Sequence, residues 1–381
     1  MPYSIPLSVP DITQHEINAV TEALKSSSLS MGAYVEQFEQ ACARLTNRRE
    51  AVAVSSGTAA LHCCCHAAGL KEGDEVITTP LSFIATANAI VYTGAKPVFV
   101  DINAQTLNLD PAKVEQAITP RTRAIVAAEA FGHAGGMAEI EQIAGRHELI
   151  LIEDACEGLG GRIGERPIGS FGRASCLSFC PNKQITTGEG GMILTDDGRL
   201  AELCRSLRNH GRDGTPWMTY QRLGFNYRMS ELAASLGHAQ LGRIKTILEN
   251  RRMAVNTYFQ CLIDNHYLIL PTIPQDMSMS WFVFLVRLND LFEPGDRDEV
   301  IKGLRSEGIG CNNYFPPIHL QPHVTQLLGT RAGDCPICEY ISQRTIALPC
   351  YSGMTTAQVE RVCEVLDGVM EKVLVGRKGR F

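Results

Sequence analysis

The chain has 381 residues, of which 45% are hydrophobic and 20% are charged, and its formal net charge is −6. This composition is that of a globular protein long enough for two domains. A negative net charge without a lysine and arginine stripe argues against a nucleic-acid-binding protein. No apolar run reaches the 18 residues of a membrane helix. The opening residues lack a secretory leader and the 14 cysteines are scattered, so we expect a cytoplasmic protein with reduced thiols.

The first predicted element is a helix near the N-terminus. Asp11 is a suitable N-cap for a helix that runs to about Lys25, because its carboxylate can accept hydrogen bonds from the first turn. Apolar residues recur along this segment at near-helical spacing: Ile12, Ile17, Val20 and Leu24. We therefore expect an amphipathic helix here.

Short apolar runs with helical stretches between them follow along the first half of the chain. We predict strands over residues 51–54, 75–78, 96–101, 123–128 and 149–154. Apolar strands separated by helices are typical of a mainly parallel sheet covered on both faces, and therefore of an α/β fold. In such sheets ligands bind beyond the carboxyl ends of the strands. The residues that follow each run are therefore candidates for a site.

The first strand is followed by the small-residue segment SSGTAAL, which contains Gly57 and Thr58. We interpret it as a tight turn that leads into a helix, whose free N–H groups and dipole favour an anion such as a phosphate. The segment has no GKS or GKT and is therefore not a Walker loop. Serine and threonine also cap helices without any ligand, so an ordinary cap is the alternative interpretation.

The strand over residues 149–154 ends in two acids, Glu153 and Asp154. A carboxylate at the end of a buried strand is costly unless it has a cationic partner. A helix cap or an internal ion pair would meet that need. A protonated pyridine nitrogen would also do so, and Asp154 would then keep the ring an electron sink.

Residues 175–191, SCLSFCPNKQITTGEGG, combine an apolar run, one lysine and a glycine-rich end. Lysines usually lie on solvated surfaces, whereas Lys183 follows a run that is typical of a buried strand. Such a site can lower the pKa of the amine and make it the nucleophile of a Schiff base. The alternative interpretation is a strand followed by a polar turn.

From about residue 244 the chain changes in character. We predict a long helix over residues 244–262, a strand over 281–287, and helices over 300–307 and 357–373. This pattern indicates a smaller mixed domain, so we divide the chain into a large domain (residues 1–243) and a small C-terminal domain (residues 244–381).

One histidine and cysteine pattern has spacing that a zinc site tolerates. His319 and His323 precede Cys335 and Cys338, giving H-x3-H and then C-x2-C. A proline lies within each pair and a single C-x2-C is a weak signal. We therefore expect loop packing and no metal.

A phosphate-binding turn, a strand-end aspartate and a later lysine together indicate pyridoxal phosphate. The chain also resembles the DegT/DnrJ/EryC1/StrS family of sugar aminotransferases, within fold-type I of the pyridoxal-phosphate enzymes. The resemblance covers nearly the whole chain and includes SSGTAALH, GDEVITTPLSFIATANAI, IEDACEGLGG, LGFNYRMSELAASLGHAQL and FPPIHLQP. It implies a large domain with a mainly parallel sheet between helices and a smaller C-terminal α+β domain.

The resemblance also implies roles for residues around the cofactor ring. Lys183 would form the Schiff base with pyridoxal phosphate and act as the acid and base of the proton transfers. Asp154 would pair with the pyridine nitrogen, Phe83 would lie on the face of the ring, and Glu157 would lie near its phenolic oxygen.

A second set of implied roles concerns the phosphate and the partner subunit. Gly57, Thr58 and Ser178 would hold the phosphate. Asn226, in GFNYRM, would reach the phosphate from a neighbouring chain. The active unit would therefore be a homodimer with two shared sites.

The expected reaction moves an amino group from L-glutamate to a nucleotide-linked keto sugar, with pyridoxamine phosphate as the intermediate form of the cofactor. Tyr314, His319 and Arg228 are candidates for contacts with the sugar substrate. Residues 185–191, ITTGEGG, resemble the branch that aminates C4, which indicates a 4-keto-6-deoxy sugar. We expect biosynthesis of a polysaccharide or an amino sugar.

Three alternatives stay open at this stage. The acceptor can be a 3-keto nucleotide sugar or a keto-cyclitol. Dehydratases of the family replace the lysine with histidine, and Lys183 argues against that activity. A non-catalytic regulatory protein of the same fold is the third alternative. The chain departs from the family pattern at Cys180, where an aromatic residue or histidine is common, and at AEAFGHAGG (residues 128–136), where VHLYG is usual.

Overall fold

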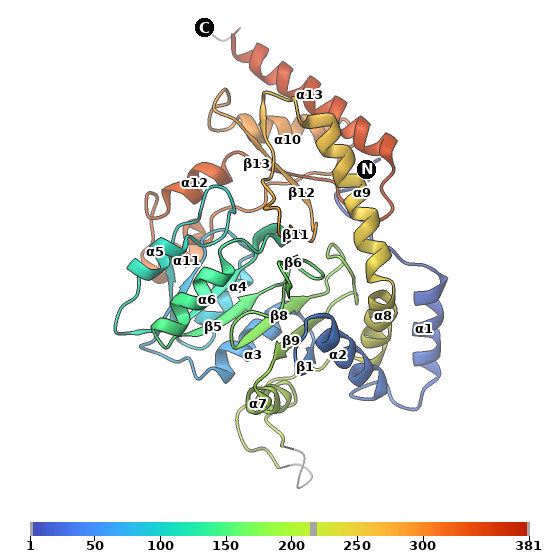
Figure 1. The fold of residues 1–381 in the computed structure, drawn as a ribbon, viewed down its shortest axis with the longest axis vertical. Helices are drawn as coiled ribbons and strands as arrows, with labels where there is room; N and C mark the ends of the chain where they lie inside the picture. The colour runs from blue at the N-terminus through green and yellow to red at the C-terminus, as the bar shows by residue number, and fades with distance from the viewer. Residues whose placement is uncertain (1–2, 214–218, 379–381) are drawn as a thin grey trace.

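A seven-stranded sheet forms the centre of the protein in a computed structural model that describes residues 3–213 and 219–378. Its strand order is β1-β9-β8-β5-β4-β2-β3, and Figure 1 labels β1, β9, β8 and β5 in it. Strand β9 runs antiparallel to both of its neighbours, β1 and β8, and the other pairs are parallel. The predicted mainly parallel sheet is therefore confirmed. The strands are β1 (Glu50–Val54), β2 (Glu75–Thr78), β3 (Lys96–Phe99), β4 (Thr122–Ala128), β5 (Ile150–Asp154), β8 (Ala174–Ser178) and β9 (Gly191–Thr195).

Helices cover both faces of this sheet. Helices α3 (Gly57–Ala67), α4 (Ala85–Val91) and α7 (Gly198–Arg208) contribute to one apolar layer, and α2 (Ala33–Leu45), α6 (Met137–Arg146) and α8 (Glu231–Gly242) contribute to layers on the other face. Alternate residues of β1 serve the two faces, since Val52 and Val54 pack with α3 while Ala51 and Ala53 pack with α2. Both faces of the strands are thus buried, which explains why the strands are continuously apolar.

The N-terminal helix, α1 (Gln14–Lys25), begins later than we predicted. Its N-cap is Thr13, which forms a capping box with Glu16, so the prediction that Asp11 caps the helix is wrong. The Asp11 carboxylate instead pairs with Arg243 at 3.0 Å. Helix α1 packs on α8 (Figure 1), yet Ile17 remains 50% exposed. Only part of the apolar surface of α1 is therefore buried within this chain.

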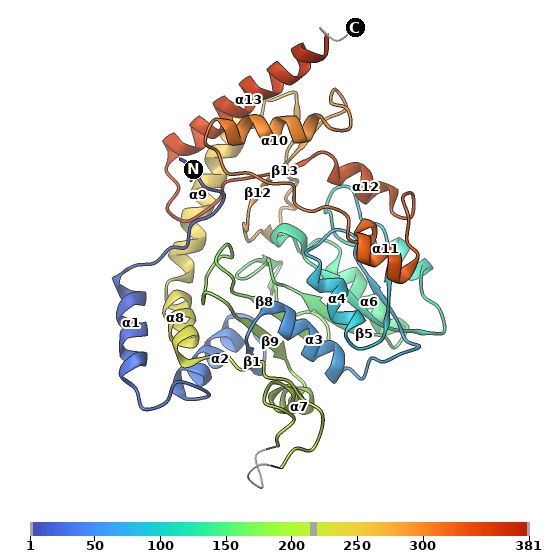
Figure 2. The same ribbon diagram turned by 180° about the vertical axis from the view of Figure 1, so that it is seen from behind.

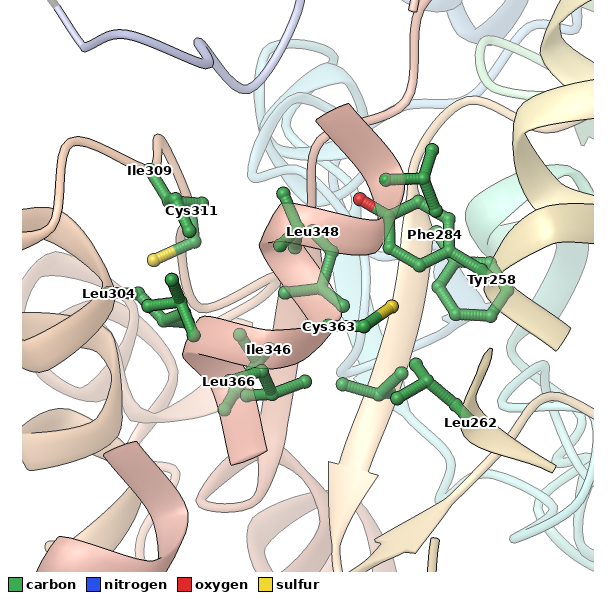
Figure 3. Packing of buried hydrophobic residues seen from close by; sticks show 14 of the residues in the cluster. Tyr258, Leu262, Phe284, Leu304, Ile309, Cys311, Ile346, Leu348, Cys363 and Leu366 are labelled. Atoms are coloured by element: carbon green, nitrogen blue, oxygen red, sulfur yellow. The ribbon is translucent and has the colours of Figure 1, made fainter. Parts of the chain in front are cut away.

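The C-terminal part forms a second layered unit. A three-stranded antiparallel sheet of β10 (Leu268–Ile269), β12 (Phe284–Leu288) and β13 (Thr345–Leu348) packs with α9 (Ile244–Leu262), α10 (Asp296–Ser306) and α13 (Thr356–Lys378). Figure 3 shows its core, where the rings of Tyr258 and Phe284 stack with centroids 4.5 Å apart. Ile5 also belongs to this core and bridges to Ile309. The division at residue 243 stays a prediction.

Short elements connect these layers, and Figure 2 shows α11 beside α4, where Val324 packs with Ala87. They are α5 (Pro111–Gln116), α11 (Pro322–Leu328), α12 (Pro336–Ser342), β6 (Arg162–Ile163), β7 (Arg166–Pro167), β11 (Met277–Ser278), and the 3-10 turns η1 (Ala130–Gly132) and η2 (Ile318–Leu320). Within the described residues, no helix is long and apolar enough to cross a bilayer.

Candidate functional site

The turn between β1 and α3 forms one wall of a deep cavity. Ser56 caps α3, and its hydroxyl accepts a hydrogen bond from the Ala59 N–H at 3.0 Å. A Cβ atom added to Gly57 would lie 2.8 Å from the Cβ of Ser178, so only glycine fits between α3 and the end of β8. Gly57, Thr58 and Ser178 therefore meet where the N–H groups and dipole of α3 favour an anion.

Asp154 ends β5 in the same cavity, with its residue only 6% exposed. One carboxylate oxygen, Oδ2, accepts a hydrogen bond from the Thr86 hydroxyl at 2.6 Å. The other, Oδ1, accepts from the Cys156 N–H at 3.3 Å. Two donors thus fix the orientation of this carboxylate. A cationic N–H in the cavity would complement its charge.

Lys183 lies in the loop that connects β8 to β9. Two backbone hydrogen bonds close the loop, from Phe179 N to Gly190 O and from Thr187 N to Phe179 O, both 2.9 Å. The lysine side chain is 9% exposed, and its Nζ lies 3.4 Å from Glu157 Oε1 and 4.0 Å from the centre of the Phe282 ring. The amine is therefore held inside the cavity by a carboxylate and an aromatic face.

The charge state of Lys183 differs from our expectation. Burial lowers the pKa of the amine, as we predicted, but the negative charge of Glu157, followed by Cys180, Cys156 and Asp154, raises it. The net direction is upward. The prediction of a lowered pKa is therefore wrong for the protein alone, because the charge of Glu157 above all counters the loss of hydration.

Glu157 links the lysine to the opposite wall. Its Oε2 accepts a hydrogen bond from the Phe131 N–H at 2.9 Å, which leaves Oε1 facing Lys183. Burial raises the pKa of Glu157, while Lys183 lowers it, and the net direction is upward. The pair thus holds a carboxyl group and an amine side by side out of water.

The cavity brings most of the predicted site residues together. It has a volume of about 580 Å³. Phe83 lies on its wall and remains 58% exposed, so the phenyl ring is available to cover a planar ligand. The predicted residues that line the cavity are Gly57, Thr58, Phe83, Asp154, Glu157, Ser178, Lys183 and Tyr314.

Three predicted residues lie outside the lining of this cavity. Asn226 is exposed and forms an isolated bridge with Asn209, whose Oδ1 accepts a hydrogen bond from Arg228 at 3.0 Å. His319 is fully buried, with its Nε2 2.9 Å from Glu339. Their assignments stay predictions. In residues 3–213 and 219–378 no cluster of three or more His, Cys, Asp or Glu side chains could hold a metal.

Glu129 is a cavity residue that our sequence analysis missed. It follows β4 and is 1% exposed, and neither carboxyl oxygen accepts a hydrogen bond from a donor in the described chain. Burial, and then the charge of the neighbouring Glu153, raise the pKa of Glu129 far above its usual range. Glu153 itself accepts from Gly169 N at 2.7 Å and Phe171 N at 2.8 Å. Glu129 is therefore a buried carboxyl group beside Glu153 whose pKa lies far above its usual range.

Thr86, Cys180 and Asn182 also line the cavity and were not predicted as site residues. Thr86 lies in SFIATA, a motif that the family resemblance includes, and Cys180 is a departure from the family pattern. The sequence therefore offered a reason to consider both residues as parts of the site. The contact of Thr86 with Asp154 joins two distant segments, which spacing within either segment does not reveal.

Comparisons with known proteins agree with this geometry. The model of the DegT/DnrJ/EryC1/StrS aminotransferase family matches residues 10–367. The spore coat polysaccharide biosynthesis protein SpsC of Bacillus subtilis is 37% identical, with 97% of each chain covered. The GDP-perosamine synthase of Caulobacter vibrioides is also 37% identical, over 96% of this chain and 98% of the relative.

Solved structures give the same result. The putative sugar aminotransferase Spr1654 of Streptococcus pneumoniae, in its PMP form, superposes with a TM-score of 0.94 at 26% identity, covering 99% of this chain and all of the other. Its PLP form gives a TM-score of 0.93 over 97% of this chain and 100% of that one. The chain therefore belongs to the DegT/DnrJ/EryC1/StrS family of sugar aminotransferases and is a pyridoxal-phosphate-dependent enzyme.

Proposed function

We propose that the protein transfers the amino group of L-glutamate to C4 of a nucleotide-linked 4-keto-6-deoxy sugar, for the synthesis of a polysaccharide or an amino sugar. The observation that carries the aminotransferase chemistry is the meeting of three groups in one cavity. These are the Lys183 amine, the Asp154 carboxylate and the N-terminus of α3 at Gly57. They match the aldehyde, the ring nitrogen and the phosphate of pyridoxal phosphate, in that order.

The fit of the cofactor rests on features of the cavity walls. Only glycine fits at position 57, because an added Cβ atom would collide with Ser178. The absence of a side chain there leaves space for a phosphate beside Thr58. Asp154, oriented by Thr86, would hold a proton on the ring nitrogen. When bound, pyridoxal phosphate supplies an electron-withdrawing ring that makes the C–H bond next to the transferred nitrogen acidic.

Lys183 is the residue that we assign to covalent attachment and to proton transfer at its Nζ atom. Glu157, 3.4 Å away, stabilises the protonated amine and would lie near the phenolic oxygen of the ring. Phe83 would cover one face of the ring and reduce its contact with water. Each of these side chains thus acts on a defined part of the cofactor.

We assign Asn226 to the cavity of a partner subunit in a homodimer. Its exposed position outside the cavity of its own chain supports this assignment. Apolar side chains at the surface of α1 support an interface as well, because Ile17 is 50% exposed and Leu24 is 56% exposed. Two shared sites per dimer follow from the symmetry of such a pair.

The C4 assignment rests on residues 185–191, ITTGEGG. The two threonines serve the loop itself, since Thr186 Oγ1 donates to Phe179 O at 3.1 Å and Thr187 Oγ1 donates to Glu189 O at 2.8 Å. Glu189 is the member of this segment that lines the cavity. We therefore assign the discrimination between C3 and C4 to the wall beside Glu189, where small changes in position have large effects on rate.

The test is an assay of the purified protein with L-glutamate and a panel of 4-keto and 3-keto nucleotide sugars. We expect turnover of a 4-keto-6-deoxy sugar, with the position of the new amine read from NMR couplings. Nitrogen at C3, or turnover only with a keto-cyclitol, would refute the C4 assignment. Borohydride reduction and peptide mapping provide an independent test, because the pyridoxyl group should be found on Lys183.

A further inference from the structure

Arg251 is a charged residue buried between α9 and the lysine loop (residues 179–190). It is 2% exposed, and in the part of the chain that the structure describes its hydrogen bonds go to backbone carbonyls, with no carboxylate as a partner. Its Nε atom has no hydrogen-bond partner among the same residues. A buried charge without an opposite charge beside it is costly. Such a residue next to Lys183 indicates a role beyond packing.

Two nitrogen atoms of Arg251 bind the backbone on different sides of the cavity wall. Nη2 donates a hydrogen bond to Lys183 O at 2.9 Å. Nη1 donates to Cys350 O at 2.8 Å, and it also lies 3.2 Å from Trp281 O and 3.3 Å from Phe282 O. A guanidinium group is planar and presents its donors in a rigid fork. Arg251 therefore fixes the lysine loop against the segment before β12 and the segment after β13.

The side chains of two residues that Arg251 holds also meet each other. Lys183 Nζ lies 4.0 Å from the centre of the Phe282 ring, and both residues line the cavity. The contacts therefore close a circle, from the Lys183 carbonyl through Arg251 to the Phe282 carbonyl, and from the Phe282 ring back to the amine. A lysine has a long flexible stem, so its amine keeps one place only where the backbone and the tip are both held.

We propose that Arg251 is a positioning residue, which holds the Lys183 amine over the Phe282 ring and beside Glu157, at the place from which it reacts with the cofactor. This inference rests on the proposed assignment of Lys183 to covalent attachment. Attachment joins Nζ to the aldehyde carbon of pyridoxal phosphate and releases the aldehyde oxygen as water. Its rate depends on where the amine lies, because a misplacement of about 1 Å costs about 100-fold in rate.

The experiment compares covalent attachment with cofactor binding in the full-length protein after the cofactor has been removed. Attachment of pyridoxal phosphate is followed by absorbance, and borohydride trapping with peptide mapping locates the modified lysine. Binding is measured with pyridoxamine phosphate, which has an amine in place of the aldehyde and does not attach to lysine. The variants are Arg251→Gln and Arg251→Lys. Arg252→Gln is the matched control, because Arg252 is exposed on the same helix and pairs with Glu249.

We expect Arg251→Gln to slow the attachment of pyridoxal phosphate by about 100-fold, because the amine is then no longer held in place. Arg251→Lys keeps a cationic donor and should slow attachment by only about 10-fold. Both variants should bind pyridoxamine phosphate as the wild type does, because Arg251 does not line the cavity. Arg252→Gln should match the wild type in both measurements.

Phe282→Leu tests the other end of the arrangement and does not depend on the folding of an Arg251 variant. It keeps the carbonyl that Arg251 binds and removes the ring on which the amine lies. We expect it to slow attachment by about 10-fold. In the double variant Arg251→Lys/Phe282→Leu, the slowing should be smaller than the product of the two single effects, because both changes release the same amine.

Attachment at the wild-type rate in Arg251→Gln or in Phe282→Leu would overturn the proposal, and so would independent effects in the double variant. An equal loss of attachment and of pyridoxamine phosphate binding would also overturn it, because Arg251 would then support the fold in general. Failure of the proposed function gives a different result, in which the pyridoxyl group of the wild type is found on a lysine other than Lys183. That result would overturn the assignment of Lys183 and this inference together.

Discussion

Glu129→Gln tests whether a neutral acid lies on the wall of the cavity. The native protein holds a proton on Glu129 that the unfolded chain releases above the ordinary pKa of 4.5. The stability that this proton contributes is complete below pH 4.5 and is lost as the pH rises toward the raised pKa of the folded state. Glutamine has nearly the same shape as glutamic acid and is neutral at every pH. The Glu129→Gln variant should therefore not lose this stability as the pH rises.

The size of the effect follows from linkage. One carboxyl group with a raised pKa lowers the free energy of unfolding by about 1.4 kcal/mol for each pH unit above its ordinary pKa. Between pH 4.5 and 6 the free energy of unfolding of the variant should therefore rise by about 2 kcal/mol relative to that of the wild type. An unfolding entropy of about 2.1 cal/mol/K per residue gives roughly 0.8 kcal/mol/K for a chain of this length. The gain therefore corresponds to an increase in Tm of about 2.5 °C relative to the wild type.

The assay is thermal unfolding of the cofactor-loaded wild type and variant in a series of buffers from pH 4.5 to 6. Glu153→Gln is the control, because it places an amide against the N–H groups of Gly169 and Phe171 and should lower Tm at every pH. A Tm difference between Glu129→Gln and the wild type that stays constant with pH would refute the reasoning. Such a result would mean that Glu129 is ionised in the native protein.

The remaining predictions concern the proposed cofactor residues. Lys183→Ala should bind pyridoxal phosphate without a covalent bond and lose turnover by at least about 10³-fold, because no neighbouring group replaces both nucleophile and base; spectra and steady-state rates check this. Asp154→Asn should keep the cofactor but lose transamination, and near-normal rates would show that another group pairs with the ring. Mixing Lys183→Ala with Asn226→Ala subunits should restore activity through one intact site per mixed dimer; mixed dimers without activity would count against a shared site.

The sequence predicts the sheet and most of the site because both depend on a simple geometric rule. Apolar runs become buried strands, and the carboxyl ends of parallel strands meet at one edge. Asp154, Gly57 and Lys183 each follow such a run, so their meeting in one cavity could be predicted without a structure. Phe83 and Glu157 required the family resemblance, because neither follows from strand position alone.

Other features were missed for identifiable reasons. Strand β9 follows the glycine-rich end of the lysine loop, and its run GMILT is a signal that we did not interpret as a strand. The cap at Thr13 could have been predicted, since Thr13 and Glu16 have the spacing of a capping box. The raised pKa of Glu129 could not, because it results from tertiary burial beside Glu153.

The antiparallel strand β9 has a consequence for protein engineering. Because β8 and β9 pair from Ser178–Gly191 to Ala174–Thr195, the chain enters and leaves the lysine loop at the same edge of the sheet. Residues 179–190 thus form a single continuous cassette with both ends fixed by strand pairing. We expect that a loop of the same length from another family member can be grafted between these ends without a change in strand register. The wall to which we assign the selection of the acceptor could then be exchanged in one segment.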